Sequence, residues 1–227
     1  MKLSVIVPVY NEQATAKRLL DKLKKVKQVS EIVIVDDGST DKTPQILKQQ
    51  AKTSKKIKLF KQQNQGKGSA VRLGLTKVTG NWVLIQDGDL EYDPIDIPNL
   101  ISYLDREGVE VVYGSRFLGP HSNLLFWHRV GNHLLNGVVN ILFDSTLSDM
   151  ETCYKLVPTK LLKDLKIQAN GFDLEPEITC KILKRNIKIF EVPISYVGRG
   201  FEDGKKITWK DGVIAFWTIL KLRFGKV

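Results

Sequence analysis

The chain has 227 residues, of which 42% are hydrophobic, and its 35 basic and 25 acidic residues give a formal net charge of +10. This length suits one sizeable domain, and no apolar run reaches the roughly 18–20 residues that a membrane-spanning helix needs. The two cysteines have no CxxC spacing and no paired histidines beside them, which argues against a disulfide framework and against a structural zinc site.

The positive charge favours anionic partners such as nucleotides, phosphorylated lipids or a membrane surface. Nucleic acid is a poor match, because the lysines are scattered and no nucleic-acid-binding motif is present. No signal peptide is visible in the opening MKLSVIVPVYNE, whose apolar run is short. We therefore expect a cytoplasmic protein, either soluble or peripheral at the cytoplasmic face of a membrane.

The first half of the chain alternates short β-branched runs with helical patterns. Near-continuous apolar strands between helices indicate an α/β fold, with a mainly parallel central sheet flanked by helices. Ligands of such sheets bind outside the carboxyl ends of the strands, where VPVYNE, VDDGSTD and QDGDLE lie. Strands are predicted at residues 2–10, 31–37, 57–62, 81–87 and 109–115. Helices are predicted at 16–26 and 66–78, and residues 38–52 are predicted to form a turn followed by a helix that carries Ile46 and Leu47.

The second half of the chain is less regular. Apolar side chains at helical spacing predict an amphipathic helix from Leu124 to Phe143, which carries asparagines on its other face. Each apolar helix either packs on the sheet or lies in a membrane interface, and for the last one we favour a membrane or a partner. We treat residues 1–208 as one domain and 209–227 as a C-terminal helix of the same unit. The other predicted elements are a helix at 171–186, one strand at 187–200 and an aromatic helix at 208–227.

The stretch LIQDGDLEYDP crowds carboxylates at every second position directly after an apolar run. In an extended chain, Asp87, Asp89 and Glu91 would point the same way. Clustered oxygen ligands suit a hard divalent cation that is shared with the phosphates of a substrate. The alternative is an acid-rich turn, because Asp and Gly are favoured in turns.

Two other strand ends carry polar side chains with two interpretations each. Tyr10 is either an aromatic wall for a ligand or a core residue, and Glu12 either accepts from a ribose diol or places charge at a helix N-terminus. Asp37 either bonds a base or ribose hydroxyl or belongs to a turn, in which Asp41 or Thr40 caps the next helix.

The stretch NQGKGSAVRLG is similar to a phosphate cradle, but it lacks the Walker spacing and the terminal GK[ST]. We interpret its glycines as a helix start and as positions of close packing. Lys67 within it is a candidate neighbour of a phosphate group.

Several motifs together resemble the inverting family 2 glycosyltransferases, in order and spacing: SVIVPVYNE, IVIVDDGSTD, GKGSAVRLG, QDGDLEYDP and VVYGSRF. Later segments, LSDMETCYKLVP, GFDLEPEIT and EVPISYVGRGFEDGKKITWKDG, are similar to the dolichyl-phosphate mannose synthase branch, which loads a sugar onto a polyprenyl phosphate. The resemblance covers residues 3–224. It implies the GT-A nucleotide-sugar fold.

The resemblance also assigns roles to residues. Many family members have Gln at the position of Glu91 and Ala at that of Gly88, and the extra negative charge of Glu91 leaves the metal preference open between Mg²⁺ and Mn²⁺. The implied metal ligands are Asp87, Asp89 and Glu91. The implied nucleotide-binding residues are Pro8, Tyr10, Glu12, Val35, Asp37, Asp87 and Gly88. The implied catalytic residues, which stabilise or bind phosphates, are Asp89, Arg116, Arg129, Arg199 and Lys205.

The implied reaction moves a hexose from a nucleoside-diphosphate sugar, of the GDP-mannose or UDP-glucose type, to a dolichyl or undecaprenyl phosphate. A phosphate monoester is largely ionised at neutral pH, so this acceptor needs no strong base. A hydroxyl acceptor would need one, for which Glu175 or Glu177 is the candidate. The QxxRW motif of processive synthases is absent. A nucleotidyltransferase is a more distant alternative, and the sequence does not indicate the base, the sugar or the oligomeric state.

Overall fold

The structure, a computed structural model, describes residues 1–122, 126–199 and 208–225. Lys205, for which a phosphate-binding role is predicted, lies outside the described residues. The elements follow in the order β1 (Leu3–Val9), α1 (Ala16–Lys25), β2 (Val29–Asp36), α2 (Thr43–Thr53), β3 (Ile57–Lys61), α3 (Lys67–Lys77), β4 (Trp82–Ile85), η1 (Pro94–Asp96), α4 (Ile97–Ser102), η2 (Tyr103–Asp105), β5 (Val111–Ser115), β6 (His121–Ser122), α5 (Phe126–Phe143), β7 (Lys155–Pro158), α6 (Thr159–Asp164), α7 (Leu174–Leu183), β8 (Ile189–Pro193), β9 (Tyr196–Val197) and α8 (Trp209–Phe224).

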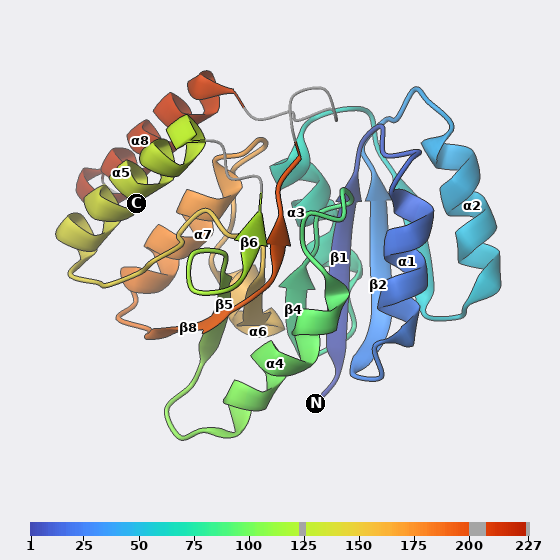
Figure 1. Cartoon of the computed structure of the whole chain (residues 1–227), viewed down its shortest axis with the longest axis horizontal. Helices are drawn as coiled ribbons and strands as arrows, with labels where there is room; N and C mark the ends of the chain where they lie inside the picture. Colours follow the sequence, from blue (N-terminus) through green and yellow to red (C-terminus); the bar gives the residue numbers. More distant parts are fainter. Residues whose placement is uncertain (123–125, 200–207, 226–227) are drawn as a thin grey trace.

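A seven-stranded sheet in the order β3-β2-β1-β4-β7-β5-β8 forms the centre of the molecule (Figure 1). Its strands are parallel except β7, which lies between β4 and β5 and pairs antiparallel with both. The predicted α/β class with a mainly parallel sheet is therefore confirmed. Because β1, β2 and β4 run in one direction, their carboxyl ends meet at one edge.

The prediction of one continuous strand over residues 187–200 is wrong, because the structure has two short strands there, β8 and β9. β8 ends at Pro193 and pairs with β5, whereas β9 pairs with β6 in a separate two-stranded sheet. Pro193 is the register partner of Ser115, and the backbone N of Ile194 still donates to the carbonyl oxygen of Ser115 at 3.2 Å, after which the pairing with β5 ends. The break redirects the chain and carries Tyr196 and Arg199 toward the end of β4, where an isolated bridge joins Tyr92 and Tyr196.

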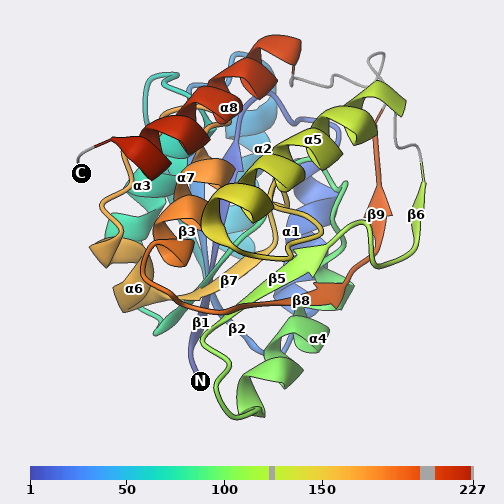
Figure 2. The same ribbon diagram turned by 90° about the vertical axis from the view of Figure 1, so that its left-hand side faces the viewer.

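Helices α5, α7 and α8 pack together beside the sheet around a second apolar cluster. Figures 1 and 2 both show α5 and α8 running side by side. Ala215 and Ile219 of α8 are buried there, so the C-terminal helix shares a core with α5 and α7. Cys180 lies in this cluster and Cys153 in the main one, and both are buried free thiols, as predicted. Among the described residues, no helix combines the length and apolar character needed to cross a membrane.

Helix α5 has its polar stripe turned inward. Asn136 Oδ1 accepts from the backbone N of Met150 at 2.8 Å, and Asn140 Oδ1 accepts from that of Leu147 at 2.9 Å. The two amides therefore satisfy the backbone of the loop after α5, which would otherwise be buried unpaired. Because the asparagines face inward, much of the apolar stripe faces outward, and the exposed side chains are Phe126, Trp127, Leu134 and Ile141.

The glycines of the stretch before and within α3 have the two roles predicted for them. Gly66 starts the helix at a φ of +96°, which side chains rarely adopt, and a Cβ there would lie 2.4 Å from the carbonyl oxygen of Asn170. Gly74 lets α3 approach β1, because a Cβ would lie 2.6 Å from Ile6 Cγ2. This approach sets the position of the first residue of α3, Lys67.

We predict that Gly74→Ala lowers the free energy of unfolding by about 1–3 kcal/mol, because the added methyl group overpacks the contact with Ile6. Denaturant unfolding measures the change. Gly137→Ala in α5 is the matched control, since its Cβ meets nothing within 4 Å; it should be neutral or slightly stabilising through helix propensity. Equal effects of the two substitutions would contradict the packing role of Gly74.

Candidate functional site

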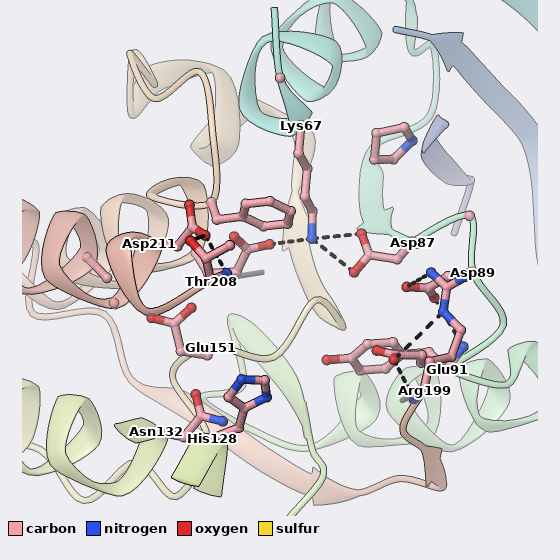
Figure 3. Close-up of a pocket in the computed structure, with 18 of the residues that line it drawn as sticks. Lys67, Asp87, Asp89, Glu91, His128, Asn132, Glu151, Arg199, Thr208 and Asp211 are labelled. Atoms are coloured by element: carbon pink, nitrogen blue, oxygen red, sulfur yellow. Dashed lines mark hydrogen bonds and ion pairs between the residues drawn. The ribbon is translucent and has the colours of Figure 1, made fainter. Parts of the chain in front are cut away.

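A cavity of about 920 Å³ lies outside the carboxyl ends of the central strands. One wall comes from the segments after β1, β2 and β4 and from the start of α3. The opposite wall comes from the starts of α5 and α8 and from the loop before β7 (Figure 3). The three polar strand ends predicted to meet at one edge all contribute to this cavity.

The acidic residues after β4 lie in a turn, not in the extended chain from which we predicted a shared direction. β4 ends at Ile85, and Leu90 has a φ of +65°, which folds the backbone back on itself. The alternate spacing of the acids is therefore not what brings them to the cavity. The turn does so, and Asp87, Asp89 and Glu91 all line the cavity.

A buried lysine meets the first of these carboxylates. Lys67 Nζ lies 2.7 Å from Asp87 Oδ1 and 2.8 Å from Glu175 Oε1 (Figure 3). Burial alone would lower the pKa of Lys67, but the two carboxylates raise it well above its ordinary value. The ammonium group is therefore a fixed positive charge between α3, the acidic turn and α7.

An arginine meets the other carboxylates. Arg199 Nη2 lies 3.1 Å from Asp89 Oδ2 and 3.2 Å from Glu12 Oε1. Its backbone N donates to Glu91 Oε1 at 2.8 Å, and the hydroxyl of Tyr196 donates to Glu91 Oε2 at 2.7 Å. Arg199 thus connects the ends of β1, β4 and β9 through one guanidinium.

These two cations do not fully compensate the acids. The pKa of Asp89 is raised to about 7, first by burial and then by the charges of Asp87 and Glu91, with Arg199 acting in the opposite direction. A carboxyl whose ionisation is this unfavourable gains from a further positive charge in the cavity. The acidic turn therefore has capacity for a cation in addition to Lys67 and Arg199.

A divalent cation fits two of the three predicted ligands. Among the described residues, no three His, Cys, Asp or Glu side chains are arranged to hold a metal ion by themselves. Asp87, Asp89 and Glu91 all line the cavity, where Asp87 pairs with Lys67 and Asp89 with Arg199. Both oxygens of Glu91 accept hydrogen bonds from Tyr196 and from the backbone of Arg199, so Asp87 and Asp89 are the better candidates. Mg²⁺ is commonly held by one or two carboxylates together with substrate phosphates, so a pair is a sufficient protein contribution. Metal ligation by Asp87, Asp89 and Glu91 stays a prediction.

The predicted nucleotide-binding residues lie together, with one exception. Pro8, Tyr10, Glu12, Asp37, Asp87 and Gly88 line the cavity. Asp37 also orders the loop before α3, since its oxygens accept from the backbone N of Gln65 and Gly66, both at 2.9 Å. Val35 is fully buried in β2 opposite Pro8 and is not among the residues that line the cavity.

Arg116 and Arg129, two of the predicted phosphate-binding arginines, differ in burial and in hydrogen-bond partners. Arg116 is buried in a bidentate pair, with Nε 2.8 Å from Asp149 Oδ2 and Nη2 2.7 Å from Asp149 Oδ1. Arg129 is exposed in the first turn of α5, beside the same cavity. Both arginines line the cavity, but Arg116 already has a structural partner, whereas Arg129 is exposed to an incoming anion.

The two candidate bases, Glu175 and Glu177, differ in their access to the cavity. The carboxylate of Glu177 accepts from the backbone N of Gln168 and Ala169 and does not line the cavity. Glu175 does line it, bound to Lys67. Of the two alternatives, Glu175 alone has access to a substrate in the cavity.

Sequence reasoning did not predict several residues that line the cavity. They come from the starts of α5 and α8 and from the loop before β7, where no motif singles out individual side chains. They are His128, Asn132, Glu151, Thr208 and Asp211 (Figure 3). The available signals were the segments LSDMETCYKLVP, which contains Glu151, and EVPISYVGRGFEDGKKITWKDG, which contains Thr208 and Asp211. Both contribute to the family resemblance as a whole and identify none of these side chains.

Comparison with known proteins places the chain among glycosyltransferases. The model of glycosyl transferase family 2 matches residues 4–166. An uncharacterised protein of Methanocaldococcus jannaschii is 26% identical over 84% of this chain and 86% of its own length. Undecaprenyl-phosphate 4-deoxy-4-formamido-L-arabinose transferase of Photorhabdus laumondii is 27% identical over 90% of this chain and 62% of its own length. Glycosyltransferase AglJ of Haloferax volcanii is 26% identical over 86% of this chain, and the match spans 63% of that relative, so both named enzymes are matched over less than two thirds of their length.

Solved structures show the same fold. Glucosyl-3-phosphoglycerate synthase of Mycobacterium tuberculosis, in complex with Mn²⁺, UDP and glucosyl-3-phosphoglycerate, superposes with a TM-score of 0.77 at 18% identity, over 98% of this chain and 80% of that chain. The same synthase with Mg²⁺ and UDP gives a TM-score of 0.74 at 20% identity, over 98% and 79%. These neighbours are GT-A glycosyltransferases, so the predicted GT-A fold is confirmed.

We predict that Lys67→Met lowers the free energy of unfolding by about 3 kcal/mol, because Asp87 and Glu175 would be left as partly buried charges without their cation. The double variant Lys67→Met/Glu175→Gln should recover part of the loss. Lys22→Met is the matched control: its pair with Asp93 is exposed, and its loss should cost no more than about 0.5 kcal/mol. Equal losses for Lys67→Met and Lys22→Met would contradict a buried role for Lys67.

Proposed function

Because the chain belongs to glycosyl transferase family 2, we propose that it transfers a hexose from a nucleoside-diphosphate sugar to a polyprenyl phosphate. The donor is of the GDP-mannose or UDP-glucose type, and the products are a lipid-phosphate sugar and a nucleoside diphosphate. One observation carries the proposal: a single cavity has the acidic strand ends on one side and two helices with exposed apolar side chains on the other. The acidic wall suits a donor diphosphate with its cation, and the apolar helices suit a lipid-linked acceptor.

The acidic wall suits the diphosphate of the donor. Asp87 and Asp89 would hold Mg²⁺ or Mn²⁺, whose charge, when the ion is bound, stabilises the departing diphosphate. Lys67 and Arg199 fix these carboxylates before the donor arrives, so little reorganisation is needed when charge develops. Tyr10 and Asp37 line the part of the cavity that the nucleoside would occupy.

The opposite wall suits the acceptor phosphate. An oxygen of the phosphate monoester forms a bond to the anomeric carbon while the bond from that carbon to the diphosphate oxygen breaks, with inversion. The nucleophile is already ionised, so cationic side chains that align two anions matter more than a base. Arg129 beside the cavity has the exposure for this role, and Arg116, Arg199 and Lys205 are proposed to assist it.

A hydroxyl acceptor is the second candidate, because Glu175 lines the cavity as a carboxylate. Product analysis decides between the two acceptors. The purified protein is incubated with UDP- and GDP-hexoses, Mn²⁺ and either a polyprenyl phosphate or a glycan, and the products are identified by mass. A glycolipid together with a nucleoside diphosphate supports the proposal. A glycosylated glycan alone contradicts it, and release of pyrophosphate would indicate a nucleotidyltransferase.

The exposed apolar side chains of α5 and α8 form what we call the helix patch. Contiguous exposed apolar surface marks an interaction site, and aromatic side chains with nearby basic residues suit a membrane interface. Lys210, Lys221 and Arg223 on α8 are exposed and would face anionic headgroups. The patch comprises Phe126, Trp127, Leu134, Ile141, Trp209, Val213, Ile214, Phe216, Trp217 and Phe224. We propose that it docks on the cytoplasmic face of the membrane that carries the acceptor.

Asp89→Asn should reduce turnover by about 100- to 1,000-fold or more, because it removes a charge that acts on the transferring group. Release of nucleoside diphosphate measures turnover, and thermal unfolding should show an intact fold. Asp93→Asn is the matched control in the same stretch, since the carboxylate of Asp93 pairs with Lys22 at the surface. Full activity of Asp89→Asn, or of the wild type in a chelator, would contradict the metal-assisted reaction.

Ile214→Gln/Trp217→Gln should weaken binding to vesicles of anionic phospholipid by about 10-fold or more. Each substitution removes the hydrophobic free energy that the apolar side chain gains when it moves from water into the bilayer interface. Sedimentation with vesicles measures this, and nucleotide affinity should not change. Ile95→Gln is the control, because Ile95 is similarly exposed but lies on η1 outside the helix patch. Unchanged vesicle binding of the double variant would rule out the patch as the membrane contact.

A further inference from the structure

The carboxyl group of Glu151 is unusual among the side chains of the cavity. It projects from the loop before β7, and Figure 3 shows it across the cavity from Asp87 and Asp89. Its Oε1 is buried and has no hydrogen-bond partner among the described residues. A buried carboxyl oxygen without a partner is costly, so a ligand that supplied one would gain affinity.

The neighbouring charges are already engaged with other groups. Lys155 Nζ donates to the carbonyl oxygens of Met150 and Thr152, both at 2.7 Å, and Arg116 is held by Asp149. Neither Lys155 nor Arg116 therefore forms a hydrogen bond with Glu151 Oε1, which stays available to a ligand in the cavity.

The electrostatic surroundings of Glu151 favour a neutral partner. Burial, followed by the charge of Glu175, raises the pKa of Glu151 to about 8, with Lys155 and Arg116 opposing the shift and Asp149 adding to it. An anionic ligand group would be repelled by Glu175 and Asp149 and by the ionised form of Glu151. A hydroxyl group can donate to a carboxylate or accept from a carboxylic acid, so it pairs with Glu151 in either protonation state.

The position of Glu151 in the cavity indicates which substrate would supply these hydroxyl groups. The donor diphosphate belongs at Asp87 and Asp89, and the acceptor belongs at the starts of α5 and α8. Glu151 lines the same cavity as Asn132 of α5 and Asp211 of α8, and Figure 3 shows it on the side of these two residues, across from Asp87 and Asp89. On the proposed placement of donor and acceptor, it lies beside the space between them. The transferred sugar must occupy that space, because its anomeric carbon lies between the diphosphate and the nucleophile.

We propose that Glu151 determines sugar specificity by hydrogen-bonding hydroxyl groups of the donor hexose. This inference rests on the proposed function. A site built to pair with a substrate hydroxyl rejects an analogue that lacks the hydroxyl, because the polar group of the protein is then left unpaired. Glu151 should therefore discriminate between hexoses, whereas the nucleoside and diphosphate contacts should be independent of it.

Binding measurements with and without the sugar test the role. The affinities of UDP, GDP, UDP-glucose and GDP-mannose are measured by calorimetry with Mn²⁺ for wild type, Glu151→Met and Glu151→Gln. Glu151→Met should weaken the preferred nucleotide sugar by about 10- to 100-fold and leave UDP and GDP within about twofold. Glu151→Gln should be intermediate, because its amide keeps part of the hydrogen bonding. Glu107→Gln, at an exposed position, is the matched control.

The pH dependence of the free energy of unfolding distinguishes a ligand-binding role of Glu151 from a purely structural one. Since the folded state holds the Glu151 proton up to a pH of about 8 and the unfolded state releases it near its ordinary pKa of 4.5, wild type should lose stability as pH rises between these values. Glu151→Met should lack this component, so its stability should fall less than that of wild type between these pH values, whatever the methionine costs through Lys155, whose buried charge Glu151 also stabilises. A variant whose stability falls with pH as steeply as that of wild type would overturn the inference.

The outcomes separate this inference from the function on which it rests. If wild type binds a nucleotide sugar and Glu151→Met binds it equally well, the inference is wrong and the proposed function stands. Equal losses for the nucleotide sugar and the free nucleotide also contradict it, since Glu151 would then act on the nucleotide. If wild type binds none of the four nucleotides, both proposals fail.

Discussion

The site depends on how carboxylates that are wholly or partly buried are kept from repelling one another. The strand ends bring Glu12, Asp87, Asp89 and Glu91 to one wall of a cavity, and each would be costly there alone. Lys67, placed by the close packing of α3, and Arg199, placed by the break after β8, lie between them. The raised pKa of Asp89 shows that the compensation is incomplete. The wall is therefore stable enough to fold and still electronegative enough to attract a cation that arrives with a diphosphate.

A second constraint explains the other wall. The inward asparagines of α5 order the loop that carries Asp149 and Glu151, so the loop and the apolar outer stripe are products of one helix orientation. Asp149 in turn fixes Arg116. The orientation of α5 thus positions both the surface proposed to contact the membrane and the side chains proposed to contact the sugar and the acceptor phosphate. This shared support suits a reaction at a membrane interface.

Much of this architecture could be predicted from local patterns, and the remainder could not for physical reasons. Near-continuous apolar runs predicted the strands β1 to β5, and local patterns predicted α1, α2 and α3, whereas α4 between β4 and β5 was not predicted. The common edge of the acidic strand ends follows from the parallel topology. The antiparallel insertion of β7 has no local signal, since a strand as short as the four residues Lys155–Pro158 fits either direction. The alternation of acids in LIQDGDLEYDP indicated an extended chain, whereas the backbone turns at Leu90. Periodicity gave the amphipathic character of α5 but not which face lies inward, and the importance of Glu151 comes only from the absence of a partner in three dimensions.

The most direct test of the central claim is the coupling between divalent metal and nucleotide. We expect UDP or GDP to bind at least about 10-fold more tightly with Mn²⁺ than in a chelator, because Asp87 and Asp89 form an adequate metal site only together with phosphate oxygens. By thermodynamic linkage, Mn²⁺ should bind correspondingly more tightly when the nucleotide is present, which electron paramagnetic resonance can measure. Nucleotide affinity that is the same with and without Mn²⁺ would contradict the account.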